Sequence, residues 1–123
     1  MSVLELRVAS SQIGASTHVV AVTGELDLYS AEQLQRALAE LIDKGAQGVV
    51  LDLMGVSFID SAGLSVLISA AKAIRSLGGR LIVAADDRRI LRLLQITGLE
   101  RSIHVERSLV EAVENVVDSR LAG

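Results

Sequence analysis

The chain has 123 residues, half of them hydrophobic, which is enough for one domain with its own core. Its formal net charge of -3 and its single Tyr and single Phe offer nucleic acid neither attraction nor a stacking surface. Cysteine is absent, which excludes disulfides and thiolate nucleophiles, and no apolar run approaches the ~20 residues of a membrane span. We expect one cytoplasmic domain over residues 1–123, ordered at about 3–118, without membrane insertion or direct nucleic-acid binding.

The first half of the chain predicts two strands followed by a helix. Residues 4–8 alternate apolar and charged side chains, as in an edge strand with one face in water, and residues 18–23 form a second strand. Ser30 begins a helix, with Gln33 at the spacing of a capping box, and apolar residues recur at helical spacing until Gly45.

The middle of the chain predicts two buried strands joined by a helix. Residues 49–53 and 80–85 are nearly continuous apolar runs, which are typical of strands covered on both faces. The helix between them begins at Ser61 and ends at Gly78. Such a strand-helix-strand unit indicates parallel strands.

Three short elements are expected after these strands. Asp87 caps a short helix, residues 103–106 form a last strand, and Ser108 caps the final helix. With no linker or internal repeat to divide the chain, this order predicts a single α/β domain.

The most informative stretch is VVLDLMGVSFIDSAGL, residues 49–64, where an apolar run ends in Asp60-Ser61 as helical spacing begins. Asp60 is expected to accept hydrogen bonds from the N–H groups of Ala62 or Gly63. A phosphate on Ser61 would meet unpaired N–H groups and the positive end of the helix dipole. Capping alone is the simpler interpretation, but Gly63 costs the first turn about 1 kcal/mol relative to Ala and so indicates close approach by a partner loop or a kinase.

The helix that begins at Ser61 has an unusual polar face. Short side chains recur along it at steps of three and four: Ser61, Ser65, Ser69, Lys72 and Ser76, here called the serine stripe. Short side chains lose little rotamer entropy when a partner docks, so the stripe is a candidate interface. The alternative is that serines are merely tolerated on this face.

Other candidate sites have weaker support. Ser61 with His18 or His104 contains the residue types of a hydrolase triad, but only half of the glycine pattern of a nucleophile elbow is present. The two histidines lie on separate predicted strands with no third ligand at a recognisable spacing, so we expect them to face solvent and expect no metal site. Phe58 is expected in the core, and Tyr29 as an interface anchor.

Two motifs carry a resemblance that covers nearly the whole length. They are Gly24-Glu25-Leu26-Asp27, after the second strand, and FIDSAGL, residues 58–64. On these motifs the chain resembles an anti-sigma factor antagonist of the STAS-domain family. The resemblance implies a STAS-like α/β domain with a four- to five-stranded mixed sheet and four flanking helices, in a bacterial regulator of transcription during stress or sporulation.

The resemblance also implies a mode of action. The unphosphorylated protein would bind an anti-sigma factor with serine kinase activity and free the sigma factor, phosphorylation of Ser61 would switch it off, and a serine phosphatase would restore it. Asp27 is expected beside Ser61. Ala62 and Ser65 depart from the commonest pattern of the family without affecting the acceptor hydroxyl.

The expected partner-binding surface lies around Ser61. Its members are Glu25, Asp27, Tyr29, Asp60, Ala62, Gly63, Leu64, Ser65 and Ser69. The protein would be a substrate of the kinase and not an enzyme, with no catalytic residues, cofactor or metal. The alternative is a non-phosphorylated STAS scaffold or soluble partner of a stressosome or a lipid-transport ATPase. A small phosphatase or hydrolase using Ser61 directly is a third possibility.

Overall fold

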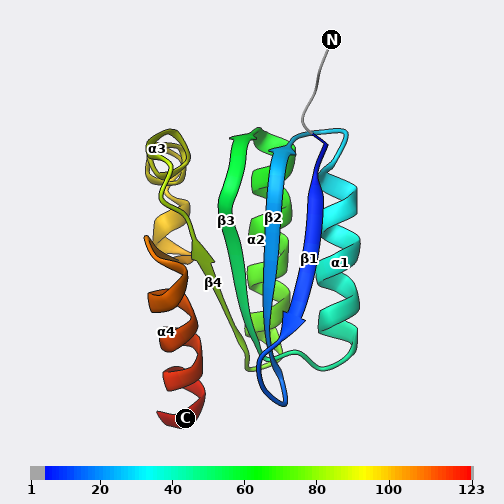
Figure 1. Cartoon of the computed structure of the whole chain (residues 1–123), viewed down its shortest axis with the longest axis vertical. Helices are drawn as coiled ribbons and strands as arrows, with labels where there is room; N and C mark the ends of the chain where they lie inside the picture. The colour runs from blue at the N-terminus through cyan, green and yellow to red at the C-terminus, as the bar shows by residue number, and fades with distance from the viewer. Residues whose placement is uncertain (1–4, 123) are drawn as a thin grey trace.

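A mixed sheet runs through the middle of the molecule (Figure 1). The computed structural model describes residues 5–122, with side chains described for residues 5–117. The five strands lie in sequence order: β1 (Arg7–Gln12), β2 (Thr17–Leu26), β3 (Gly48–Ile59), β4 (Arg80–Ala84) and β5 (His104–Glu106). β1 pairs with β2 antiparallel, and all other pairs are parallel. The predicted mixed α/β sheet is confirmed.

Helices cover the sheet on both faces, as parallel strands require. Within the described residues they are α1 (Ala31–Asp43), α2 (Ser61–Ser76), α3 (Arg88–Ile96) and α4 (Leu109–Ala122), with a short 3₁₀ turn η1 (Leu99–Arg101). α1 and α2 lie on one face and α4 on the other (Figure 1). The four predicted flanking helices are therefore confirmed.

β3 is buried on both faces because successive side chains enter different clusters. Leu51 belongs to the large core under α1, α2 and α3, whereas Val50 and Ile82 pack with Ala112 and Val116 of α4. This arrangement is the cause of the nearly continuous apolar run in its sequence.

β1 is the edge strand that the sequence predicts, but its position differs. It begins at Arg7 and extends to Gln12, and Leu6 just before it is buried. Leu4 lies outside the described residues. Most side chains of β1 are exposed, so apolar periodicity gives little indication of where this strand ends.

The capping box predicted at the start of α1 is absent. Ser30 is the N-cap but makes no side-chain cap hydrogen bond, and its hydroxyl donates to the Glu25 carbonyl oxygen at 2.7 Å. The Gln33 side-chain amide instead donates to the carbonyl oxygen of Leu6 at 3.2 Å. Both side chains bind neighbouring segments of chain, which local spacing does not reveal.

Phe58 and His18 also differ from expectation. Phe58, expected in the core, is 50% exposed, because β3 shifts register against β2 near its end and its alternation breaks there. His18, expected to face solvent, is half-buried, and its Nδ1 is buried without a hydrogen-bond partner in the described structure.

Candidate functional site

The two sequence motifs meet at one edge of the sheet. Leu26 at the end of β2 pairs with Ile59 at the end of the parallel β3, and the backbone N–H of Asp60 donates to the Leu26 carbonyl oxygen at 3.2 Å. Parallel strands end at the same edge, so the loop after β2 lies against the start of α2. At this edge, residues 24–27 and 58–64 lie against one another.

Asp60 joins these two segments through both oxygens of its carboxylate. Oδ1 accepts from the N–H groups of Ala62 at 2.9 Å and Gly63 at 3.1 Å, which confirms the predicted helix cap. Oδ2 accepts from the N–H of Leu28 at 2.9 Å, a contact that spacing along the chain does not predict. Asp60 therefore begins α2 and fixes the loop after β2.

Asp27 organises that loop from within. Its Oδ1 accepts from the N–H groups of Tyr29 and Ser30, both at 3.0 Å, and its carbonyl oxygen accepts from the N–H of Ala31 at 2.8 Å. These bonds form a tight turn into α1, as expected for an Asp at the first position of a turn. The carboxylate of Asp27 thus binds N–H groups of its own loop. The carboxylate of Asp60, the residue directly before Ser61, caps the helix that carries Ser61.

Ser61 is the first residue of α2 and is exposed. Its hydroxyl has no hydrogen-bond partner among the described residues, while its carbonyl oxygen accepts from the Ser65 hydroxyl at 2.9 Å. The expectation that a phosphate here would meet unpaired N–H groups is wrong for the three N–H groups that follow Ser61. The N–H groups of Ala62 and Gly63 bind the Asp60 side chain, and that of Leu64 binds the Asp60 carbonyl oxygen at 3.0 Å.

Gly63 is required by packing within this chain. A Cβ at this position would lie 2.7 Å from the carbonyl oxygen of Leu26, 2.8 Å from Leu26 Cγ and 3.0 Å from Ile59 Cγ2. The interpretation that Gly63 admits a partner loop or kinase is therefore wrong, because the glycine is buried against the ends of β2 and β3. Leu64, also expected on the partner surface, is only 9% exposed and belongs to the core.

The remaining expected residues lie at the surface to different degrees. Tyr29 is 92% exposed, Ser65 and Ser69 are exposed, and Glu25 and Ala62 are partly buried. Leu28, which the sequence reading missed, is 69% exposed beside Tyr29 on the same loop. An apolar residue directly after Gly-Glu-Leu-Asp, at a turn, was the available signal.

The histidines do not join Ser61 in a hydrolase triad. His18 is near the amino end of β2 and Ser61 follows the carboxyl end of the parallel β3, so they lie at opposite edges of the sheet. His104 Nε2 lies 2.6 Å from Glu106 Oε1, and the Asn115 side-chain amide donates to the same oxygen at 3.0 Å. The hydrogen bond from His104, with a smaller contribution from Asn115, lowers the pKa of Glu106.

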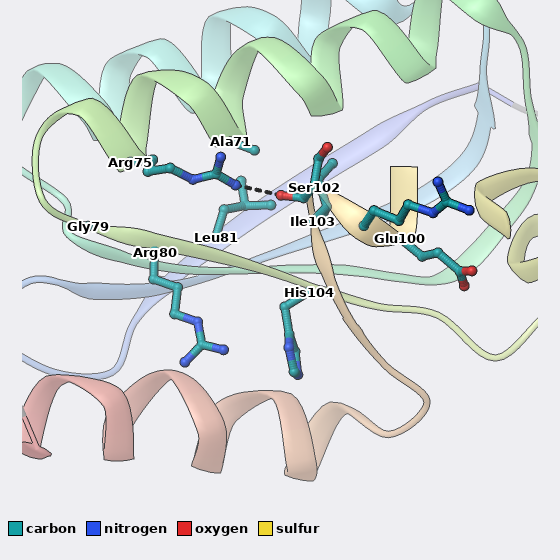
Figure 2. A pocket seen from close by; sticks show the side chains of 10 residues that line it. Ala71, Arg75, Gly79, Arg80, Leu81, Glu100, Ser102, Ile103 and His104 are labelled. Atoms are coloured by element: carbon teal, nitrogen blue, oxygen red, sulfur yellow. Dashed lines mark hydrogen bonds between the residues drawn. The ribbon is translucent and has the colours of Figure 1, made fainter. Parts of the chain in front are cut away.

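A pocket of about 280 Å³ lies away from Ser61, at the amino ends of β4 and β5 (Figure 2). Arg75 crosses to η1 and donates to the carbonyl oxygen of Ser102 at 2.5 Å. Arg80 and His104 extend on the other side of β4 from Arg75 (Figure 2), so the Arg75 and Arg80 guanidinium groups do not converge on one point. Among the described residues, no cluster of His, Asp or Glu suits a metal ion, and no helix is long and apolar enough to cross a membrane.

Comparisons with known proteins agree with this fold and its motifs. The STAS domain family matches residues 10–112. An anti-sigma-B factor antagonist of Staphylococcus epidermidis is 36% identical over 86 residues, which are 70% of this chain and 80% of the relative. The crystal structure of an anti-sigma factor antagonist from Mycobacterium paratuberculosis superposes with a TM-score of 0.83 at 25% identity, covering 91% of this chain and 94% of the other.

A more distant structure shares the fold. The Bacillus cell fate determinant SpoIIAA in its phosphorylated form gives a TM-score of 0.71 at 22% identity, over 89% of this chain and 99% of SpoIIAA. The family match over residues 10–112 and the 36% identity to the staphylococcal protein identify the family of the chain, which the likeness to SpoIIAA in fold alone does not. The chain belongs to the STAS-domain family, among its anti-sigma factor antagonists.

Proposed function

We propose that this protein binds an anti-sigma factor with serine kinase activity through the surface around Ser61, and that phosphorylation of Ser61 ends the binding. The observation that carries the proposal is the exposed hydroxyl of Ser61, free of hydrogen bonds to described residues, directly after Asp60. The kinship with anti-sigma factor antagonists supports the class of partner. A serine phosphatase would restore the binding form, and the cytoplasm is the compartment in which these partners act.

The surface around Ser61 offers a partner both apolar and small side chains. Leu28 and Tyr29 project from the loop after β2, and Ser65 and Ser69 continue along α2. Exposed aromatic and aliphatic side chains on a fixed loop are suitable anchors in a protein interface. The serines of α2 permit close docking at little cost in rotamer entropy.

Phosphorylation would act on the interface more strongly than on the helix. A phosphate adds about -1.5 to -2 charges at neutral pH, beside the carboxylate of Asp60. The favourable dipole term at a helix start is about 0.3 to 1 kcal/mol, and the repulsion from Asp60 opposes it. Desolvating such a charge in an interface without a basic partner costs several kcal/mol, and every 1.4 kcal/mol is tenfold in affinity.

The geometry of Asp60 supports survival of the fold after modification. The first-turn N–H groups already bind Asp60, so the start of α2 does not depend on the Ser61 hydroxyl. SpoIIAA, which shares the fold, has been solved in a phosphorylated form, so the fold itself is compatible with that state. In this proposal the protein acts by binding and is a kinase substrate rather than a catalyst.

The test is to incubate the purified protein and ATP with each anti-sigma factor kinase of its host, and to measure intact mass and binding. We expect the mass of one phosphoryl group to be added at Ser61, with loss of binding to the same kinase. The Ser65→Ala variant, one turn further along α2, serves as the control and should still be modified. Binding without modification would support the scaffold alternative, and hydrolysis of a chromogenic ester that requires Ser61 would support an enzyme.

A further inference from the structure

Among the described residues, the outer edge of β1 has no strand partner and has little of the usual protection of an edge strand. In the described part of the chain, β1 pairs only with β2, and that pairing has no register shift. Its sequence RVASSQ contains no Lys and no Pro, its one charged residue is Arg7 at the start, and five of its six side chains are exposed. Proteins usually protect such edges with lysine, proline or a bulge, because the unpaired N–H and C=O groups accept another strand.

A groove of about 590 Å³ lies between this edge and α1. Val8 and Ser10 form its strand side. On its helix side, four exposed charged residues follow one another at steps of four: Glu32, Arg36, Glu40 and Lys44. Their signs alternate from negative to positive along the helix, and residues at this spacing share one face.

This alternating row is complementary to itself when reversed. A two-fold axis perpendicular to the sheet would relate two antiparallel β1 strands. The same axis would place the two α1 helices antiparallel to each other on the same face of the joined sheet. Glu32 of one copy would then be level with Lys44 of the other, and Arg36 with Glu40. Within one copy Arg36 binds Glu32 at 2.6 Å, an exposed pair of the weak kind that can exchange partners. Every position in the row would meet the opposite charge, which favours a second copy over an unrelated strand.

The centre of the row lies about one residue from the centre of β1. β1 and α1 run in the same direction (Figure 1), and the Gln33 side chain binds the carbonyl oxygen of Leu6, which places these residues side by side. The middle of the charged row is about 7 to 8 Å further along α1, at about 1.5 Å per residue. The same distance along the strand, at about 3.3 Å per residue, leads from Leu6 to a point between Val8 and Ala9.

We propose that two copies of this chain pair through antiparallel β1 edges, with the two-fold axis at Ala9. The two sheets then become one continuous sheet, the open N–H and C=O groups of β1 are satisfied, and the charged rows of α1 face one another. The pairing does not involve Ser61, so its tests are separate from those of the proposed partner binding, although Tyr29 lines the groove as well as the surface around Ser61. A segment of another protein on the same edge is the competing occupant.

Charge swaps test the pairing in solution by sedimentation velocity. The wild type should dimerise, and the protein concentration at which half of the chains are dimeric should rise with salt. The double variants Glu32→Lys/Glu40→Lys and Arg36→Glu/Lys44→Glu should each weaken dimerisation by about tenfold or more. Mixing these two variants should give a heterodimer. The matched control carries all four changes, which restores an alternating row and should restore the dimer. A wild type that stays monomeric up to about millimolar concentration, or a dimer indifferent to these swaps, overturns the proposal.

Cysteine cross-linking tests the position of the axis, because the natural chain has no cysteine. Two copies of residue 9 directly opposite each other have Cα atoms about 4.5 to 5.5 Å apart, within the range of a disulfide. Ala9→Cys should therefore form a covalent dimer on mild oxidation. Ser11→Cys is the matched control, since it lies on the same strand and face but about 13 Å from its copy. Equal cross-linking of the two variants overturns the axis at Ala9.

Discussion

The carboxylate of Asp60 holds the backbone N–H of Leu28 at 2.9 Å, across 32 positions of sequence. Its other oxygen caps α2 through Ala62 and Gly63. One side chain therefore sets the start of the helix that carries Ser61 and the position of the loop that carries Tyr29. This arrangement makes Asp60 a positioning residue for the whole surface.

Replacing Asp60 should lower stability through two lost functions. Asp60→Ala removes the α2 cap, which is worth about 1 to 2 kcal/mol, and also the bond to Leu28. Asp87→Ala is the matched control, because Asp87 caps α3 through the N–H groups of Arg89 and Ile90 and its ion pair with the exposed Arg89 side chain is local and weak. Urea unfolding should show a larger loss of unfolding free energy for Asp60→Ala. A loss no greater than that of the control would show that the Leu28 bond contributes nothing.

Adding a methyl group at Gly63 should destabilise the protein, although Ala normally favours helices. The new Cβ would lie 2.7 Å from the Leu26 carbonyl oxygen, and backbone at this distance has to move. Overpacking of this kind costs about 1 to 3 kcal/mol, against a helix-propensity gain of about 1 kcal/mol. Thermal unfolding of Gly63→Ala should show a reduced Tm. Ser69→Ala, at an exposed site on the same helix, should not lower it.

The Ser61 variants should separate binding from folding. Ser61→Ala should fold normally and bind the kinase partner without being modified, whereas Ser61→Asp should bind more weakly because it adds a negative charge beside Asp60. Ser76→Asp, at the far end of the serine stripe, controls for charge alone. Calorimetric titration with the partner measures all three affinities. Equal affinities of Ser61→Ala and Ser61→Asp for the partner would contradict the proposed switch.

Tyr29 should contribute to binding and hardly at all to stability. Its side chain is 92% exposed, so Tyr29→Ala should change the unfolding free energy by less than about 0.5 kcal/mol. An aromatic anchor in an interface is worth about 2 kcal/mol or more, which is a loss of more than tenfold in affinity. Leu77→Ala is the control, since Leu77 is 54% exposed at the other end of α2. A similar effect of both variants on partner affinity would place the interface elsewhere.

Glu106 should stabilise the fold at neutral pH and lose this effect in acid. The hydrogen bond from His104 holds the pKa of Glu106 below its ordinary value of 4.5. A carboxylate with a lowered pKa in the folded state stabilises above its unfolded pKa, and that stabilisation disappears as the pH falls through the folded pKa. The stability difference between wild type and Glu106→Gln should therefore shrink below pH 4.5. Glu114→Gln, exposed on α4, corrects for the loss of one negative charge, and a difference that stays constant in acid would contradict this linkage.

Sequence periodicity was sufficient to predict the strands and helices in which burial follows a regular pattern. Buried neighbours on both faces of β3, such as Val50 and Leu51, give a continuous apolar run, and the cap at Asp60 depends on residues two and three positions away. These patterns are local, so the parallel core and the start of α2 could be predicted. The resemblance to a known family added the choice of Ser61 as the acceptor.

Contacts between distant segments could not be predicted in this way. Val56 and Ile59 are both buried although they are three positions apart, so the strand does not keep a strict alternation and Phe58 is left exposed. The reason for Gly63 lies in Leu26, on another strand. Leu28 is held by Asp60 from a separate segment, and no spacing within either segment encodes that bond.

The double attachment of Asp60 also bears on the kinetics of recognition. Because Leu28 and Tyr29 are held relative to the start of α2 before any partner arrives, little ordering of this chain is needed on encounter. Association should then be limited by orientation and charge, and variants of the exposed loop should differ mainly in how long the complex lasts. Loosening the loop at Asp60, by contrast, should slow complex formation itself.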